Sequence, residues 1–85
     1  MYYVYLLQCA DGTIYTGSTN DLQRRFREHK NSAGGRYTRS HKVSKILYTE
    51  QFKVRSTALR REAQIKGWQR EKKLNLVKFG KPAIK

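Results

Sequence analysis

Residues 1–19 read MYYVYLLQCADGTIYTGST, and this stretch decides the fold. Residues 1–8 are apolar and aromatic and predict a strand, and residues 13–19 are rich in Thr, Ile and Tyr and predict a returning strand. Between them, Ala10, Asp11 and Gly12 are typical of a turn. Apolar residues fall on both faces of the first strand, so we expect a central strand that is covered on both sides.

The length of the turn decides where Tyr5 and Tyr15 point. A two-residue loop would pair Tyr5 with Ser18 and leave Tyr15 facing away from Tyr5. A three-residue loop with Gly12 in the left-handed region would pair Tyr5 with Gly17 and make the two tyrosines diagonal neighbours on one face. We predict the second register, because a site that uses both tyrosines requires it.

The rest of the chain carries helical and extended patterns in turn. The expected elements are a helix over residues 22–30, a third strand over 45–53, a second helix over 57–69 and a short helix from residue 72 onward. Asn20 or Asp21 can cap the first helix, and Ser56 can cap the second. The sequence therefore predicts an α+β fold, a small three-stranded antiparallel sheet flanked by helices. We expect a single domain over residues 1–80 and a frayed tail over residues 81–85.

Charge is the strongest bulk property of the chain. Nineteen Lys and Arg stand against six Asp and Glu among 85 residues, a formal net charge of +13. Such an excess favours a polyanionic partner, and nucleic acid is the commonest one. A ribosome-associated or simply soluble basic domain is the alternative. The basic residues are spread along the chain and no apolar run could cross a bilayer, so we expect no membrane association.

Cys9 is the one cysteine in the sequence. It allows no internal disulfide and fits a reducing, cytoplasmic location. A lone cysteine near a strand end is most simply a small buried hydrophobe, and we expect no nucleophilic role for Cys9.

Ionisable residues interrupt the apolar stripes of both long predicted helices. The stripes are Leu22, Arg25, Phe26 and His29 in the first helix, and Ala58, Leu59, Glu62 and Ile65 in the second. A carboxylate in an apolar stripe costs free energy unless it is paired or binds a cation, so Glu62 either pairs with Lys66 or Arg25 or holds a divalent metal. Arg25 either reaches past Phe26 to water or clamps a phosphate. His29 is either structural or a participant in proton transfer.

Residues 31–42 predict a flexible basic loop around Gly34 and Gly35. Long loops without regular structure in small domains are usually functional or disordered, which points to a binding role. The candidate nucleic-acid contacts are Arg36, Tyr37, Arg39 and Lys42 in this loop, together with Gly17, Arg24 and Lys66 elsewhere.

Taken in order, these residues resemble the GIY-YIG nuclease domain. Tyr3-Val4-Tyr5 matches the first half of the family motif, with Tyr3 in place of its first Gly, and Tyr15-Thr16-Gly17 matches the second half. The segment from Gly17 through Arg25 to His29 is similar to the one that carries the catalytic Arg, and Arg61-Glu62-Ala63 to the helix with the metal-binding Glu.

The resemblance extends over about residues 2–77. Gly35-Arg36-Tyr37-Thr38 is similar to the loop motif of the small stand-alone bacterial branch (YhbQ-like), which itself resembles Slx-type structure-specific endonuclease domains. Asn75 lies in the region of a late family Asn.

The resemblance implies a metal-dependent DNA endonuclease that hydrolyses phosphodiester bonds, in repair or in the processing of branched or damaged DNA. By position, Tyr5 would accept a proton from the attacking water or orient it, and Arg25 would neutralise developing negative charge. Glu62 would bind one Mg²⁺ or Mn²⁺, which we expect only with substrate. Tyr15 and His29 would position water or share the proton.

Two further roles complete the expectation. Gly17 would leave space for the phosphate backbone of the substrate. The alternative to catalysis is a nucleic-acid-binding module of the same fold that does not cut or that depends on a protein partner, and a basic interaction protein without catalysis is a third reading.

Overall fold

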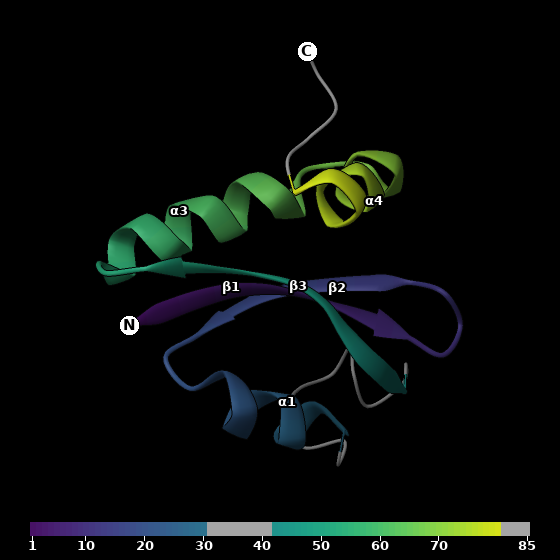
Figure 1. The fold of residues 1–85 in the computed structure, drawn as a ribbon, viewed down its shortest axis with the longest axis horizontal. Helices are drawn as coiled ribbons and strands as arrows, with labels where there is room; N and C mark the ends of the chain where they lie inside the picture. The colour runs from purple at the N-terminus through teal and green to yellow at the C-terminus, as the bar shows by residue number, and fades with distance from the viewer. Residues whose placement is uncertain (31–41, 81–85) are drawn as a thin grey trace.

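The computed structural model describes residues 1–30 and 42–80, and the fold is an α+β sandwich around one small sheet. The elements are β1 (Tyr2–Cys9), β2 (Ile14–Thr19), α1 (Leu22–Lys30), β3 (Val43–Phe52), α3 (Arg55–Lys66) and α4 (Arg70–Phe79). The three strands form one antiparallel sheet in the order β2-β1-β3. Figure 1 shows α3 and α4 on one face of the sheet and α1 on the other. The predicted fold class and the central position of the first strand are confirmed.

The hairpin has the register that the tyrosine site requires. Gly12 adopts a φ of 87°, a left-handed conformation that costs glycine little. The Cys9 N–H donates to the Thr13 carbonyl at 2.9 Å, which closes the predicted three-residue loop. Tyr5 consequently pairs with Gly17 across β1 and β2.

Side-chain alternation along β1 divides the core into two layers. One layer, on the α3 and α4 side, contains Val4, Leu6, Ala58, Ile65 and Leu76. The other, on the α1 side, contains Tyr5, Leu7, Cys9 and Val43, with Leu22 and Phe26 packed against them. Because successive strand residues point to opposite faces, one central strand supplies both layers. Cys9 is a buried core residue, as expected.

The helix boundaries differ from the predicted ones where capping was misread. Asp21 caps α1 as predicted, since its Oδ1 accepts from the Arg24 N–H at 3.1 Å. Ser56 does not cap the next helix: α3 begins at Arg55 after Val54, which provides no side-chain cap. Its end at Lys66 lies before the predicted one, because Gly67 closes the helix.

Two smaller expectations also need correction. β3 begins at Val43, two residues before the predicted start. Leu59, placed on the apolar stripe from sequence, is 41% exposed and lies outside the core. The predicted tail over residues 81–85 lies outside the described residues. Among the residues that the structure describes, no helix has the length and apolarity needed to cross a bilayer.

An ion pair fixes α3 to β3, an edge strand of the sheet. Arg61 Nε and Nη2 donate to the two oxygens of Glu50 on β3, each at 2.9 Å. Tyr48 Oη also donates to this carboxylate, at 2.7 Å. Although burial alone would raise it, the pKa of Glu50 is held below its usual value because these donors favour the charged form. This bidentate contact sets the position of α3, and with it that of Glu62.

Candidate active site at the edge strand

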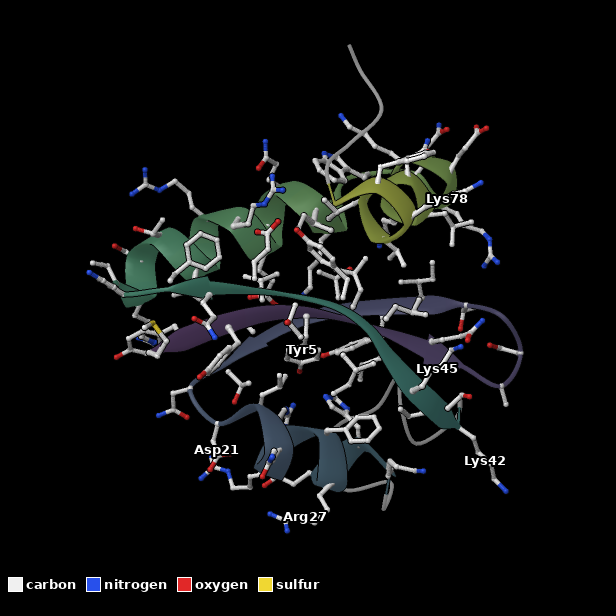
Figure 2. All side chains as sticks on the ribbon, in the orientation of Figure 1. Tyr5, Asp21, Arg27, Lys42, Lys45 and Lys78 are labelled. Carbon is white, nitrogen blue, oxygen red and sulfur yellow. The ribbon has the colours of Figure 1, made fainter. Side chains whose placement is uncertain are left out.

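Tyr5, Tyr15 and His29 form a compact group between the sheet and α1. Tyr5 Oη lies 3.0 Å from His29 Nε2 in a buried hydrogen bond. The ring centroids of Tyr5 and Tyr15 are 6.3 Å apart, and those of Tyr15 and His29 are 5.1 Å apart. Figure 2 shows the Tyr5 side chain on the α1 side of the sheet. The predicted diagonal pairing of the tyrosines therefore exists, and the α1 histidine joins it.

Gly17 makes this grouping sterically feasible. A Cβ atom at Gly17 would lie 2.5 Å from Tyr5 Oη and 2.7 Å from Tyr5 Cζ. The Tyr5 ring thus lies across the cross-strand glycine and points its hydroxyl toward the free edge of β2. The phenol of Tyr5 thus occupies the place that a side chain at Gly17 would take. A nucleic-acid contact by Gly17 stays a prediction.

The environment fixes the protonation states of the two central groups. Burial raises the pKa of Tyr5 to about 12, against the opposing influence of a hydrogen bond from Arg25. Burial and the neighbouring Arg25 charge lower the pKa of His29 to about 4. At neutral pH the structure therefore holds a phenol against a neutral imidazole, and one imidazole nitrogen is available as an acceptor.

Arg25 approaches the tyrosines from α1 and is partly buried. Its Nη1 pairs with Glu28 Oε1 at 3.0 Å, and 31% of its side chain is exposed. Burial opposes its charge, but hydrogen bonds to Glu28 and Tyr5 more than compensate and raise the pKa of the guanidinium above its usual value. Arg25 is therefore a fixed cation beside the Tyr5 hydroxyl, and part of its side chain is exposed to solvent. Glu28, whose side chain is 40% exposed, is its orienting partner.

Glu62 approaches the same edge from the opposite face of the sheet. Ser18 Oγ donates to Glu62 Oε1 at 2.7 Å, and Ser18 pairs with Val4, whose side chain faces α3. Lys66 Nζ lies 3.1 Å from Glu62 Oε2. The side chain of Glu62 is only 16% exposed, whereas that of Lys66 is 53% exposed. Lys66, one of the two ion-pair partners considered from the sequence, contacts the carboxylate.

The two halves of the site meet at β2. Gly17 and Ser18 are consecutive, so one belongs to the α1 face and the other to the α3 face. The charge of Glu62 contributes to the raised pKa of Tyr5, which puts the carboxylate within electrostatic reach of the phenol. Tyr5, Tyr15, Arg25 and His29 converge on one side of the edge strand, and Glu62 reaches it from the other. Ser18, which sequence reasoning missed, connects the halves.

A metal at this place would have a single protein carboxylate. Among residues 1–30 and 42–80, no group of three or more His, Cys, Asp or Glu side chains is placed to hold an ion. The Glu62 carboxylate nevertheless fits Mg²⁺ or Mn²⁺, which often take one or two carboxylates and complete their shell with water and phosphate oxygens. Its Oε2 is held by the exposed Lys66, a partner that can move away.

The remaining candidates for nucleic-acid contact are spread over the surface. Arg24 and Lys42 are exposed, and Figure 2 shows labelled basic residues on α1, at the start of β3 and on α4. Arg36, Tyr37 and Arg39 lie outside the described residues. Asn75 lines a hollow beside Trp68 at the corner between α3 and α4, and no contact joins it to Glu62 in the described part. The roles of these residues stay predictions.

The family model described as the GIY-YIG catalytic domain matches residues 1–75. The chain belongs to the GIY-YIG family. This family suggests a nuclease with a nucleic-acid substrate, and GIY-YIG nucleases generally use a divalent metal.

Relatives and a solved structure agree with this membership. A UPF0213 protein of Staphylococcus saprophyticus is 39% identical over 93% of this GIY-YIG chain and 96% of its own. A UPF0213 protein of Haloquadratum walsbyi is 44% identical over 93% of this chain and 89% of its own. The solution NMR structure of a UPF0213 protein from Bacillus halodurans has a TM-score of 0.55 at 38% identity, covering 92% of this chain and 84% of that one. The predicted family and its small stand-alone branch are thereby confirmed.

Proposed function

We propose that this protein is a metal-dependent DNA endonuclease that hydrolyses phosphodiester bonds at the edge of β2. The observation that carries the proposal is the Tyr5 hydroxyl, which is held over Gly17 between His29 and Arg25, one residue from the Ser18 that holds Glu62. A neutral hydrogen-bonded pair, a fixed cation and a carboxylate are the groups that such a hydrolysis uses. The net charge of +13 supports a polyanionic substrate.

Tyr5 cannot act as a free phenolate at neutral pH, because its pKa is about 12. In the proposed reaction, water forms the new bond to phosphorus and gives a proton to the Tyr5 oxygen. The Tyr5 proton passes at the same time to His29 Nε2, 3.0 Å away. A bound phosphate favours this transfer, since negative charge raises the pKa of a neighbouring imidazole. The bond to the leaving oxygen breaks, and that oxygen takes a proton from solvent.

Arg25 holds the reacting phosphate in this scheme, and Tyr15 orients His29. The Arg25 guanidinium, oriented by Glu28, offers its open side to the phosphate oxygens as negative charge develops. Tyr15 packs on His29 and keeps the imidazole turned toward Tyr5. Glu62 would hold the divalent metal, which when bound polarises the phosphate and stabilises the leaving oxygen.

Cleavage assays with matched variants test the proposal. Nicked, flap and branched DNA are incubated with Mg²⁺ or Mn²⁺ and the wild type, Arg25→Ala or Glu62→Gln. We expect each variant to lose at least about a hundredfold in rate, the usual effect of losing one group that stabilises a developing charge. Arg27→Ala and Glu71→Gln remove an exposed residue of the same type and should cut like the wild type. Cutting that survives both Arg25→Ala and Glu62→Gln would disprove the site.

A nucleic-acid-binding module without catalysis is the second candidate. Two observations favour it: no group of three or more possible metal ligands exists among the described residues, and Lys66 already forms an ion pair with the Glu62 carboxylate. Tight binding of branched DNA with no cleavage on any of these substrates, with either metal, would support this reading against the first. A role in repair and a protein partner are part of the proposal and follow from the resemblance alone.

A further inference from the structure

A hollow opens between the end of β2 and the first turns of α3. Its volume is about 330 Å³, within the range of small-molecule sites, and its lining combines polar and apolar side chains. Asn20 and Arg55 supply hydrogen-bond donors, and Tyr2 and Leu59 supply apolar surface. No Asp or Glu is among the described residues that line it.

The hollow is continuous with the candidate active site through Ser18. Ser18 lines this hollow, and its hydroxyl donates to Glu62 Oε1 at 2.7 Å. A nucleic-acid strand that crosses β2 at Gly17 and passes Ser18 therefore enters the hollow next. The hollow lies on the α3 side of the strand, away from Tyr5 and His29.

Arg55 gives the hollow a strongly positive end. It is exposed, and no ion pair joins it to a carboxylate of the described residues. It is the first residue of α3, where a cation is unfavourable for the helix, and the first turn has no acidic residue to offset it. The arginine thus adds no evident stability, and its charge is available to a phosphate.

We propose that this hollow binds the nucleotide that adjoins the cleaved phosphodiester. Arg55 contacts its phosphate, Asn20 contacts its polar groups, and Tyr2 and Leu59 pack against its sugar or base. The proposal rests on the proposed function and adds a direction to it: the substrate strand runs from the β2 edge across Ser18 toward α3. The ligand class is a nucleotide because the hollow offers a cation, amide and hydroxyl groups and apolar surface together.

Arg55→Gln tests the proposal, with Arg60→Gln as the matched control. Arg60 is exposed on the same helix but lines a separate hollow with Phe52 and Thr57. A fluorescent single-stranded oligodeoxynucleotide is titrated without divalent metal, so that nothing is cut. We expect Arg55→Gln to weaken binding roughly tenfold, as for a lost hydrogen bond to a charged group. Its salt dependence, the slope of log K against log [salt], should fall by about 0.7.

Amide NMR shifts locate the contact on the full chain. A 5′-phosphorylated thymidine dinucleotide should shift the signals of residues 18–20 and 55–59 in the wild type. It should leave them in place in Arg55→Gln, whereas Arg60→Gln should behave like the wild type. Equal losses in both variants, or shifts confined to other residues, would overturn the proposal.

The outcomes separate this proposal from the proposed function. If the wild type cuts DNA through Glu62 but Arg55→Gln and Arg60→Gln bind DNA equally well, the nucleotide site is ruled out and the endonuclease proposal is unaffected. If the wild type binds the dinucleotide at residues 18–20 and 55–59 but cuts no DNA, the nucleotide site is supported and the endonuclease proposal is ruled out.

Discussion

Replacing Gly17 by Ala should strongly destabilise the protein, because the added methyl group would meet the buried Tyr5 ring. The new Cβ would lie 2.5 Å from Tyr5 Oη, 2.7 Å from Tyr5 Cζ and 3.1 Å from Tyr15 Cε2. Ordinary contacts between such atoms begin near 3.5 Å, so the phenol must retreat by about 1 Å. Gly17 does not have a positive φ, so the effect is steric and not a matter of backbone conformation.

The magnitude follows from what the Tyr5 ring must give up. Only 2% of Tyr5 is exposed, so the ring has little free space to move into. Overpacking a core typically costs 1–3 kcal/mol, and breaking the hydrogen bond to His29 leaves a buried group without its partner at a similar cost. We therefore expect a loss of about 2–5 kcal/mol in the free energy of unfolding, a large fraction of the stability of a small domain.

Guanidinium unfolding followed by the fluorescence of Trp68, the single tryptophan, measures this loss. Gly67→Ala is the matched control, because its new Cβ would meet nothing closer than 3.6 Å. It should change stability by less than about 1 kcal/mol. In a Tyr5→Phe background the nearest contact disappears, and the cost of Gly17→Ala should fall by about 1 kcal/mol or more. A Gly17→Ala protein within 0.5 kcal/mol of the wild type, or an equal cost in both backgrounds, would refute the reasoning.

Three further predictions concern single groups. Because the folded pKa of His29 is lowered to about 4, its contribution to stability is complete above pH 6.5 and is lost as pH falls toward 4. The wild type should therefore lose up to about 3 kcal/mol more than His29→Gln over that window in urea unfolding, and parallel pH profiles would contradict this. Thr16 Oγ1 is buried with no hydrogen-bond partner in the described residues, so Thr16→Val should raise the unfolding free energy by about 1 kcal/mol. The control Thr19→Val should lower the unfolding free energy, because the Thr19 hydroxyl accepts from the Asp21 N–H at 3.1 Å. A Thr16→Val protein less stable than the wild type would contradict the prediction. Lys66→Met should tighten Mn²⁺ binding about two- to fivefold, since it frees Glu62 Oε2 from an exposed ion pair, as followed by paramagnetic broadening of amide signals; unchanged or weaker binding would count against it.

Local chemistry explains why the hairpin and its register were predictable. The left-handed residue in the turn is a glycine, and the choice between two loop lengths decides which residue faces Tyr5. The apolar stripe of the first helix likewise placed Arg25 and His29 on its inward face and left their partners open. Periodicity placed each residue on a face, whereas the choice between the two registers came from the requirement that one site use both tyrosines.

The contacts that complete the site join residues far apart in the sequence, and no local sequence pattern predicts them. Ser18 and Glu62 are 44 positions apart in sequence and meet only after α3 has packed on the sheet. The use of Gly17 to seat the Tyr5 phenol likewise follows from the tilt of one ring across the strand pair. By residue type, Ser56 predicts a helix cap, but α3 begins one residue before it, at Arg55, and has no side-chain cap. Residue type alone did not locate the helix start.

The arrangement of the site around an edge strand constrains any substrate that it takes. Adjacent residues of β2 point to opposite faces, so the Tyr5 hydroxyl over Gly17 and the Glu62 carboxylate on Ser18 lie on different sides of one strand. A single phosphate can approach both only from beside the strand, where the sheet formed by the described residues ends. The phosphate that is cleaved must therefore lie beside the β2 edge and not above either face. A fourth strand or a bound peptide on that edge would exclude it, so a β2-edge ligand is expected to inhibit cleavage even without contacting any of the proposed catalytic side chains.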